Sequence, residues 1–259
     1  MLQPTSSMYR TLLLAGLLAL TVSASAADAS AKDDVTNAAK KLAAAPNYSW
    51  KTTVDMGAAA GAGGGGRMRP GPTEGRTEKD GLTMLSMTRG DTTTEAFLKG
   101  DKAAIKTADG WKSIAEATEG GGGGGGGQGG QGNPARFIAR TLQGYKTPAV
   151  EAQDLAAKAK ELTKSGDAFA GDLTPEAAKE LLARGPRRGG ADGPATSNEK
   201  GSVKFWVKDG SLTKYEVHVQ GTMNFNGDSR DIDRTTTVEI KDVGTTKVEA
   251  PEDAKKKLS

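Results

Sequence analysis

Apolar and polar residues alternate along several segments of the chain, which is the pattern of half-buried β-strands. The clearest segment is 202–221, "SVKFWVKDGSLTKYEVHVQG", which predicts a β-hairpin. Its apolar residues fall on one face: Val203, Phe205, Val207, Tyr215, Val217 and Val219. A three-residue loop over 208–210 keeps them together by pairing Phe205 with Thr213 and Val203 with Tyr215. One face of the hairpin is therefore predicted to be buried or to line a space.

Other segments predict further strands. Residues 47–56, "NYSWKTTVDM", alternate cleanly and place Tyr48 and Trp50 on the same face. Between residues 82 and 117, short apolar runs are separated by turn signals, and residues 232–242 predict another strand after an Asn226-Gly227 turn. Short strands that are separated by regularly spaced turns are typical of antiparallel meanders.

Helical signals separate the two groups of strands. Residues 33–45 predict an amphipathic helix capped by Asp33 or Asp34, and Pro46 ends it. Three later helices each begin with Asn or Thr followed by Pro, which suits the cap and the first helical position: 133–143, 147–162 and 174–185. Another helix follows a proline near the C-terminus. We expect one α+β domain with a long antiparallel sheet.

Glycine-rich stretches interrupt this pattern at 57–71, 119–132 and 185–199. Such stretches bury too little apolar surface to offset the entropy lost on ordering, so we expect flexible loops within a single domain over 27–259. None has the spacing, lysine and helix start of a phosphate-binding loop.

The N-terminus has the pattern of a secretory signal. Arg10 precedes the apolar stretch "TLLLAGLLALTV" and the small residues "SASAADAS". We expect residues 1–26 to be a signal peptide cleaved after Ala26, and the mature protein to be periplasmic or secreted. No other segment reaches the roughly 18 apolar residues of a membrane helix, so we expect no stable membrane anchor after cleavage.

The composition of the chain limits the kinds of functional site that it can form. The chain has no cysteine and one histidine, which excludes disulfides, cysteine lipidation at the cleavage site, and metal sites built on cysteines or several histidines. Its net charge is +3, and removal of Arg10 with the signal leaves +2, so the charge gives no case for nucleic acid. We expect no cofactor and no metal.

No group of residues indicates a reaction. His218 lies between Glu216 and Gln220 on the polar face of the hairpin, where a general base is conceivable and a surface histidine is the more ordinary interpretation. The acids and amides of "NFNGDSRDID" (224–233) fit a hairpin turn better than a calcium loop. We therefore expect a binding or interaction protein and not an enzyme.

Two stretches resemble a known superfamily. They are "LKGDKAAIKTADGWKSIAE" (98–116) and "VKFWVKDGSLTKYEVHVQG" (203–221) followed by "TTTVEIKDVGTTKVEAPEDA" (235–254). With the helix that precedes the first strand, their element order resembles the LolA-like, LppX-like superfamily of secreted lipid- and lipoprotein-handling proteins. The resemblance implies a strongly curved half-barrel sheet, covered by short helices around apolar space. This chain departs from the lipoprotein relatives by lacking the lipobox cysteine.

Six apolar residues are candidates for the wall of such a space: Trp50, Phe137, Ile138, Phe205, Tyr215 and Val217. A closed core uses the same residue types, so the sequence leaves both interpretations open. Two functions follow. One is an exported binding protein that carries a lipid or lipidated cargo, such as a lipoprotein. The other is an envelope structural or interaction module of the same fold, with an envelope protein as partner and no ligand.

Overall fold

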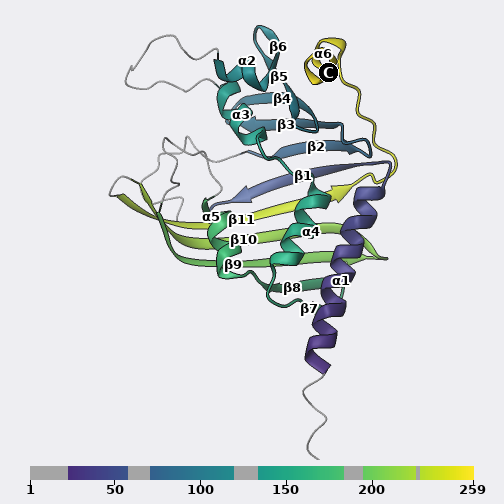
Figure 1. Ribbon diagram of the computed structural model, residues 1–259, viewed down its shortest axis with the longest axis vertical. Helices are drawn as coiled ribbons and strands as arrows, with labels where there is room; N and C mark the ends of the chain where they lie inside the picture. The colour runs from purple at the N-terminus through teal and green to yellow at the C-terminus, as the bar shows by residue number, and fades with distance from the viewer. Residues whose placement is uncertain (1–22, 58–70, 120–133, 184–194, 226–227) are drawn as a thin grey trace, which may run out of the picture.

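The structure is a computed structural model that describes residues 23–57, 71–119, 134–183, 195–225 and 228–259 (Figure 1). Most of the expected signal peptide (residues 1–22), most of the three glycine-rich stretches and the Asn226-Gly227 turn lie outside the described residues. The described helices are α1 (Ser23–Ala44), α2 (Ile114–Glu119), α3 (Pro134–Leu142), α4 (Pro148–Lys158), α5 (Pro175–Ala183) and α6 (Glu252–Leu258).

Two antiparallel meanders make up one sheet. The first contains β1 (Asn47–Asp55), β2 (Thr73–Glu78), β3 (Thr83–Arg89), β4 (Thr92–Lys99), β5 (Lys102–Thr107) and β6 (Gly110–Ser113). The second contains β7 (Thr163–Ser165), β8 (Ala168–Asp172), β9 (Ala195–Lys208), β10 (Ser211–Phe225) and β11 (Asp228–Lys241).

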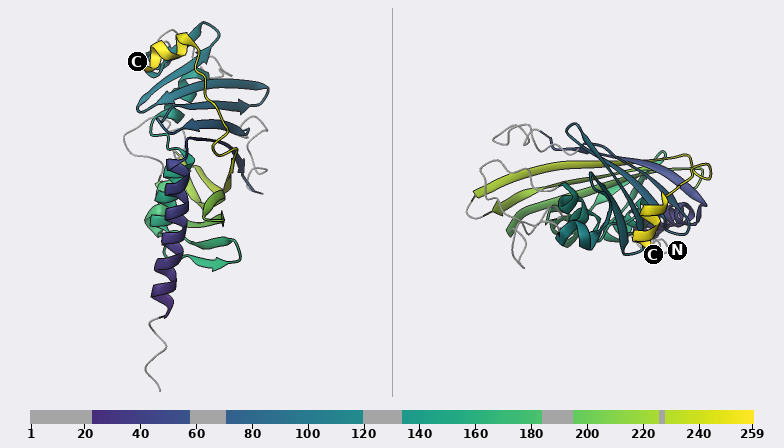
Figure 2. Two further views of the ribbon diagram at one scale, coloured as in Figure 1. Left: turned by 90° about the vertical axis from the view of Figure 1, so that its right-hand side faces the viewer. Right: turned by 90° about the horizontal axis from the view of Figure 1, so that it is seen from above.

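The meanders join at the centre of the sheet, where β1 pairs with both β2 and β11. The order of strands is β6-β5-β4-β3-β2-β1-β11-β10-β9-β8-β7, so the described sheet is open, with β6 and β7 at its edges. It curves around the helices on one side (Figure 2). The predicted fold class, α+β with a long curved antiparallel sheet covered by short helices, is confirmed.

Helices α1, α3, α4 and α5 cover one face of the sheet, which we call the inner face (Figure 1). Helix α1 packs along α4, and Lys32 of α1 donates hydrogen bonds to the carbonyls of Ala159 (2.7 Å) and Lys160 (2.8 Å) just beyond α4. A lysine there offsets the partial negative charge of a helix C-terminus. Helix α5 packs on β9 and β10, and Arg234 of β11 donates to the Leu181 carbonyl (2.7 Å) near the end of α5.

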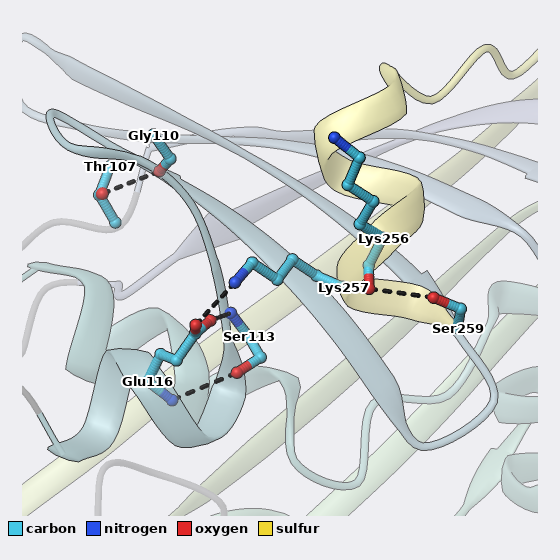
Figure 3. Close-up of polar contacts among 7 residues, drawn as sticks. All are labelled: Thr107, Gly110, Ser113, Glu116, Lys256, Lys257 and Ser259. Carbon is cyan, nitrogen blue, oxygen red and sulfur yellow. Dashed lines mark hydrogen bonds and ion pairs between the residues drawn. The ribbon is translucent and has the colours of Figure 1, made fainter.

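The opposite face, the outer face, carries a second and smaller apolar layer. There α6 packs on β4, β5 and β6. The buried residues of this layer, which include two of the C-terminal segment, are Phe97, Ala104, Val248, Ala250 and Ala254. An ion pair closes the rim of this layer: Lys257 of α6 donates to Glu116 of α2 at 2.6 Å (Figure 3). Glu116 also accepts the Ser113 backbone N–H at 2.7 Å, while Ser113 caps α2 through its hydroxyl.

The helix predicted over 33–45 begins ten residues earlier, at Ser23. Asp33 and Asp34 therefore lie inside α1 and do not cap it. The preceding residues are rich in alanine, the strongest helix former, so the helix extends through them. The inward face was predicted correctly, since Val35 and Leu42 are buried.

The predicted register of the 202–221 hairpin is wrong by two residues over most of its length, since Phe205 was predicted to pair with Thr213. The turn has two residues, Asp209 (φ 52°) and Gly210 (φ 66°), and Phe205 pairs with Tyr215. The shorter turn shifts the pairing by one residue, and a β-bulge at Thr213 shifts it by a second. Because side chains alternate between faces with a period of two, the apolar residues still share one face. The third glycine-rich stretch is also shorter than predicted, since residues 195–199 belong to β9.

Candidate functional site

Five of the six predicted wall residues have described side chains, and all five lie in the main core on the inner side of the sheet. Phe205 and Tyr215 are fully buried, and the other three are almost so: Trp50, Ile138 and Val217. Phe137 belongs to α3, but its side chain lies outside the described residues. The structure thus brings the predicted strand residues to one face. In the described core these side chains pack against other side chains.

Trp50 lies flat against the neighbouring strand β2, because the residue that pairs with it there is Gly75. A Cβ atom at Gly75 would come within 2.1 Å of the Trp50 ring. The indole N–H of Trp50 donates to the Thr77 hydroxyl at 3.3 Å, and the Thr83 hydroxyl donates to the same oxygen at 3.2 Å. Trp50 also stacks on Tyr145, with ring centroids 6.2 Å apart and planes at 23°.

Four polar side chains gather within this apolar layer, and we call them the tyrosine cluster: Tyr48, Tyr145, Tyr215 and Glu151. The Tyr215 hydroxyl donates to Glu151 Oε2 at 2.7 Å. The hydroxyls of Tyr48 and Tyr145 are buried and have no hydrogen-bond partner. Tyr145 is partly exposed as a residue, but its hydroxyl is shielded from solvent.

Burial sets the protonation of the cluster. It raises the pKa of Tyr145 and Tyr215 well above the ordinary value, and the negative charge of Glu151 raises both further. Burial also raises the pKa of Tyr48. The Thr147 side chain, the Ala149 backbone and the Thr77 side chain lie near its hydroxyl and oppose this rise, although none of them reaches hydrogen-bond geometry. The three phenols therefore stay protonated at neutral pH and are available as donors.

The fold explains why these residues meet. Tyr48 and Tyr215 stand on the inner side of β1 and β10. Tyr145 follows α3 directly after Gly144, whose positive φ of 78° turns the chain. Glu151 lies in the first turn of α4, which begins at Pro148, a residue suited to the first helical position; Thr147 precedes it without a side-chain cap bond. The sequence prediction included Tyr215 but missed Tyr145 and Glu151.

Two hollows open on the outer side of the sheet. One, of about 380 Å³, lies beside the C-terminal segment over Phe97 and Trp111. The other, of about 470 Å³, lies around His218. His218 Nε2 and Asp233 Oδ1 are 2.8 Å apart on an open strand surface, which agrees with the interpretation of His218 as a surface residue. None of the five predicted wall residues with described side chains lines either hollow.

Metal sites and membrane-spanning helices are both absent from the described residues. No group of three or more His, Cys, Asp or Glu side chains in these ranges is placed to hold a metal ion. Among the described helices, none combines the length and the apolar character needed to cross a membrane.

The fold and the cluster define a class: an α+β protein with an open curved sheet, whose helix-covered apolar layer contains the two unpaired hydroxyls of Tyr48 and Tyr145. No family model matches the chain, and no curated protein does. Among solved structures the chain is similar to LprF from Mycobacterium bovis, with a TM-score of 0.45 and 9% identity, over 87% of this chain and 98% of that one. It is likewise similar to the Mycobacterium tuberculosis lipoprotein LppX, with a TM-score of 0.44 and 9% identity, over 86% and 100%.

The resemblance to LppX-like proteins that the order of elements suggested is thus found again in the comparison of structures. At this identity the likeness concerns the arrangement of strands and helices, and the site must be interpreted from the residues of this chain.

Proposed function

We propose that this is an exported binding protein that holds a lipid, or another ligand with a long apolar part, between the inner face of the sheet and its helices. The observation that carries this proposal is the pair of buried hydroxyls without partners, on Tyr48 and Tyr145. An unpaired buried hydroxyl costs about 1–3 kcal/mol, and phenylalanine would fill the same space without that cost. Unpaired hydroxyls that carry this cost are expected to form hydrogen bonds with a ligand from outside the chain.

The ligand would enter by movement of α3 and α4 away from the sheet, since the inner layer is packed in the structure. Helix α4 packs on α1 and reaches the strands below through side chains such as Glu151. A separation there would open the space next to Trp50, Phe205 and Tyr215, the predicted wall.

The expected location is the periplasm or the outside of the cell, with cleavage after Ala26. The support is the arrangement of Arg10, the apolar stretch and the small residues that follow. A cargo of lipid or lipidated protein would suit that compartment. N-terminal sequencing of protein recovered from the cell envelope should begin at Ala27, and a start at Met1 or Met8 in the cytosol would contradict export.

Native mass spectrometry tests the binding function. We expect full-length protein, expressed with its own signal and recovered from the envelope, to carry an added mass of lipid size. After delipidation it should take up lipid again from a total lipid extract. A protein that stays free of added mass in both experiments would contradict the proposal.

A second candidate is an interaction module that uses the outer face of β8–β11. The observation in its favour is Trp206, which projects from β9 on that face with Lys204 and Lys214 over its ring at 4.8 and 4.4 Å. Trp206→Ala separates the two functions. It should leave lipid uptake unchanged if the ligand lies inside, and should abolish capture of an envelope protein if this face binds one.

A further inference from the structure

The tyrosine cluster has the donors to recognise a particular kind of polar group. Tyr48 is 2% exposed, and its hydroxyl and that of Tyr145 lack partners, whereas the Tyr215 hydroxyl is already bound to Glu151 at 2.7 Å. A neutral phenol donates one hydrogen bond. Two donors are therefore available to a group that brings acceptor oxygens into the layer.

The carboxylate of Glu151 limits which group fits. Its negative charge acts on Tyr145 and on Tyr215, so a carboxylate or phosphate placed among these side chains would meet a like charge. A cationic group would attract Glu151 but would offer no acceptor to the hydroxyls of Tyr48 and Tyr145. A neutral group with ester, ether or hydroxyl oxygens satisfies both conditions.

The surroundings fit an oxygen-bearing head group attached to an apolar chain. The Trp50 ring stacks on Tyr145 on one side of the cluster, and the rings of Phe205 and Tyr215 lie 6.3 Å apart on another. Apolar residues thus adjoin the polar group, as a ligand with both parts requires. Resting on the proposed function, we propose that the tyrosine cluster is the polar-group subsite of the internal site. It selects neutral, oxygen-bearing head groups over anionic ones.

Ligands that share one alkyl chain length and differ in head group test this proposal. Delipidated full-length protein would be titrated with monopalmitoylglycerol, palmitate, hexadecylamine and hexadecane, and binding followed by native mass spectrometry and by tryptophan emission. We expect monopalmitoylglycerol to bind roughly tenfold more tightly than the other three, from two added hydrogen bonds.

Variants assign the preference to the cluster. The double variant Tyr48→Phe, Tyr145→Phe should bind monopalmitoylglycerol no better than hexadecane. Glu151→Gln keeps an acceptor for Tyr215 but removes the charge, so palmitate should bind several-fold more tightly. Thr83→Val is the matched control, because its hydroxyl already pairs with Thr77 and its loss should leave the order of ligands unchanged.

Stability provides an independent measurement. Because the Tyr48 hydroxyl has no partner, Tyr48→Phe should leave the denaturant midpoint unchanged or raise it while it weakens binding. A lower midpoint with an unchanged order of ligands would show that the hydroxyl is structural and would overturn the subsite. Equal binding of all four ligands would overturn the subsite and leave the binding function. If none of the four ligands binds, both the subsite and the proposed binding function are overturned.

Discussion

The two apolar layers of this protein lie on opposite faces of one sheet and differ in how their polar groups are treated. In the outer layer, Phe97, Val248 and Ala254 pack together, and the polar groups beside them are paired: Glu78 accepts the Val248 backbone N–H at 3.0 Å, and Lys257 pairs with Glu116 at the rim. Under the helices, tyrosine hydroxyls point into the layer, and those of Tyr48 and Tyr145 have no partner in the described residues. The polar groups of the outer layer that we describe are paired, whereas two buried hydroxyls of the inner layer are not, and the proposed binding site rests on this difference.

Truncation of a large ring in each layer should give the largest effect. Phe205→Ala removes a fully buried ring from the centre of the inner layer and should lower the free energy of unfolding by about 3–5 kcal/mol. Phe97→Ala should cost less, about 2–3 kcal/mol, because the C-terminal segment over it can settle into the space. Chemical denaturation measures both. A smaller loss for Phe205→Ala than for Phe97→Ala would indicate that Phe205 borders an unfilled cavity.

A smaller effect is expected where the inner layer meets β2. Gly75→Ala would place a methyl group in the space that the Trp50 ring occupies, so the ring must move away from Tyr145. We expect a loss of about 1–3 kcal/mol and a change in tryptophan emission. Glu74→Ala, on the exposed side of the same strand, is the control and should change neither quantity appreciably. An unaltered emission for Gly75→Ala would contradict the contact between Trp50 and β2.

The smallest effect concerns the rim of the outer layer and depends on pH. The Lys257 ammonium, together with the Ser113 backbone N–H and hydroxyl, lowers the pKa of Glu116 to about 2, from an ordinary value of 4.5. A depressed carboxyl pKa adds stability that is fully present above the unfolded value and is lost as the pH falls from about 4.5 to 2.

Lys257→Met should therefore be slightly less stable than the wild type at neutral pH, and the difference should shrink across that acid range. Thermal unfolding at a series of pH values measures it, with Lys40→Met, an exposed lysine of α1, as the control. A difference that does not change between neutral pH and the acid range would show that Lys257 contributes packing and not charge.

The sequence predicts the strand faces of this fold better than their pairing. The alternation in 202–221 identifies the buried residues correctly, because side chains on a strand must point to opposite faces. The register depends on the bulge at Thr213, which leaves no pattern that separates it from a three-residue loop. Strand β2, "TEGRTE", was missed because it contains no large apolar residue; its inner positions are Gly75, beneath Trp50, and Thr77.

The sequence predicted only part of the candidate site, because only the strand residues of the site follow a regular alternation. Trp50, Phe205, Tyr215 and Val217 follow from strand alternation and do reach one inner face. Tyr145 lies between two helices, and Glu151 lies in a helical turn where acidic residues are common. Neither has a periodicity that marks it as buried. Only the packing of α4 over the sheet brings them together, and that contact is distant along the sequence.

The two edges of the sheet have a consequence for the behaviour of the protein at high concentration. An open antiparallel sheet presents unpaired backbone groups at its edges, and long flat edges recruit further chains and start fibrils. Here the edges are β6, with four residues, and β7, with three residues that are all exposed. Each includes a lysine, Lys112 or Lys164. Edges this short and charged give a neighbouring molecule little backbone to pair with, so a sheet of this width can remain in solution without spreading from one copy to the next.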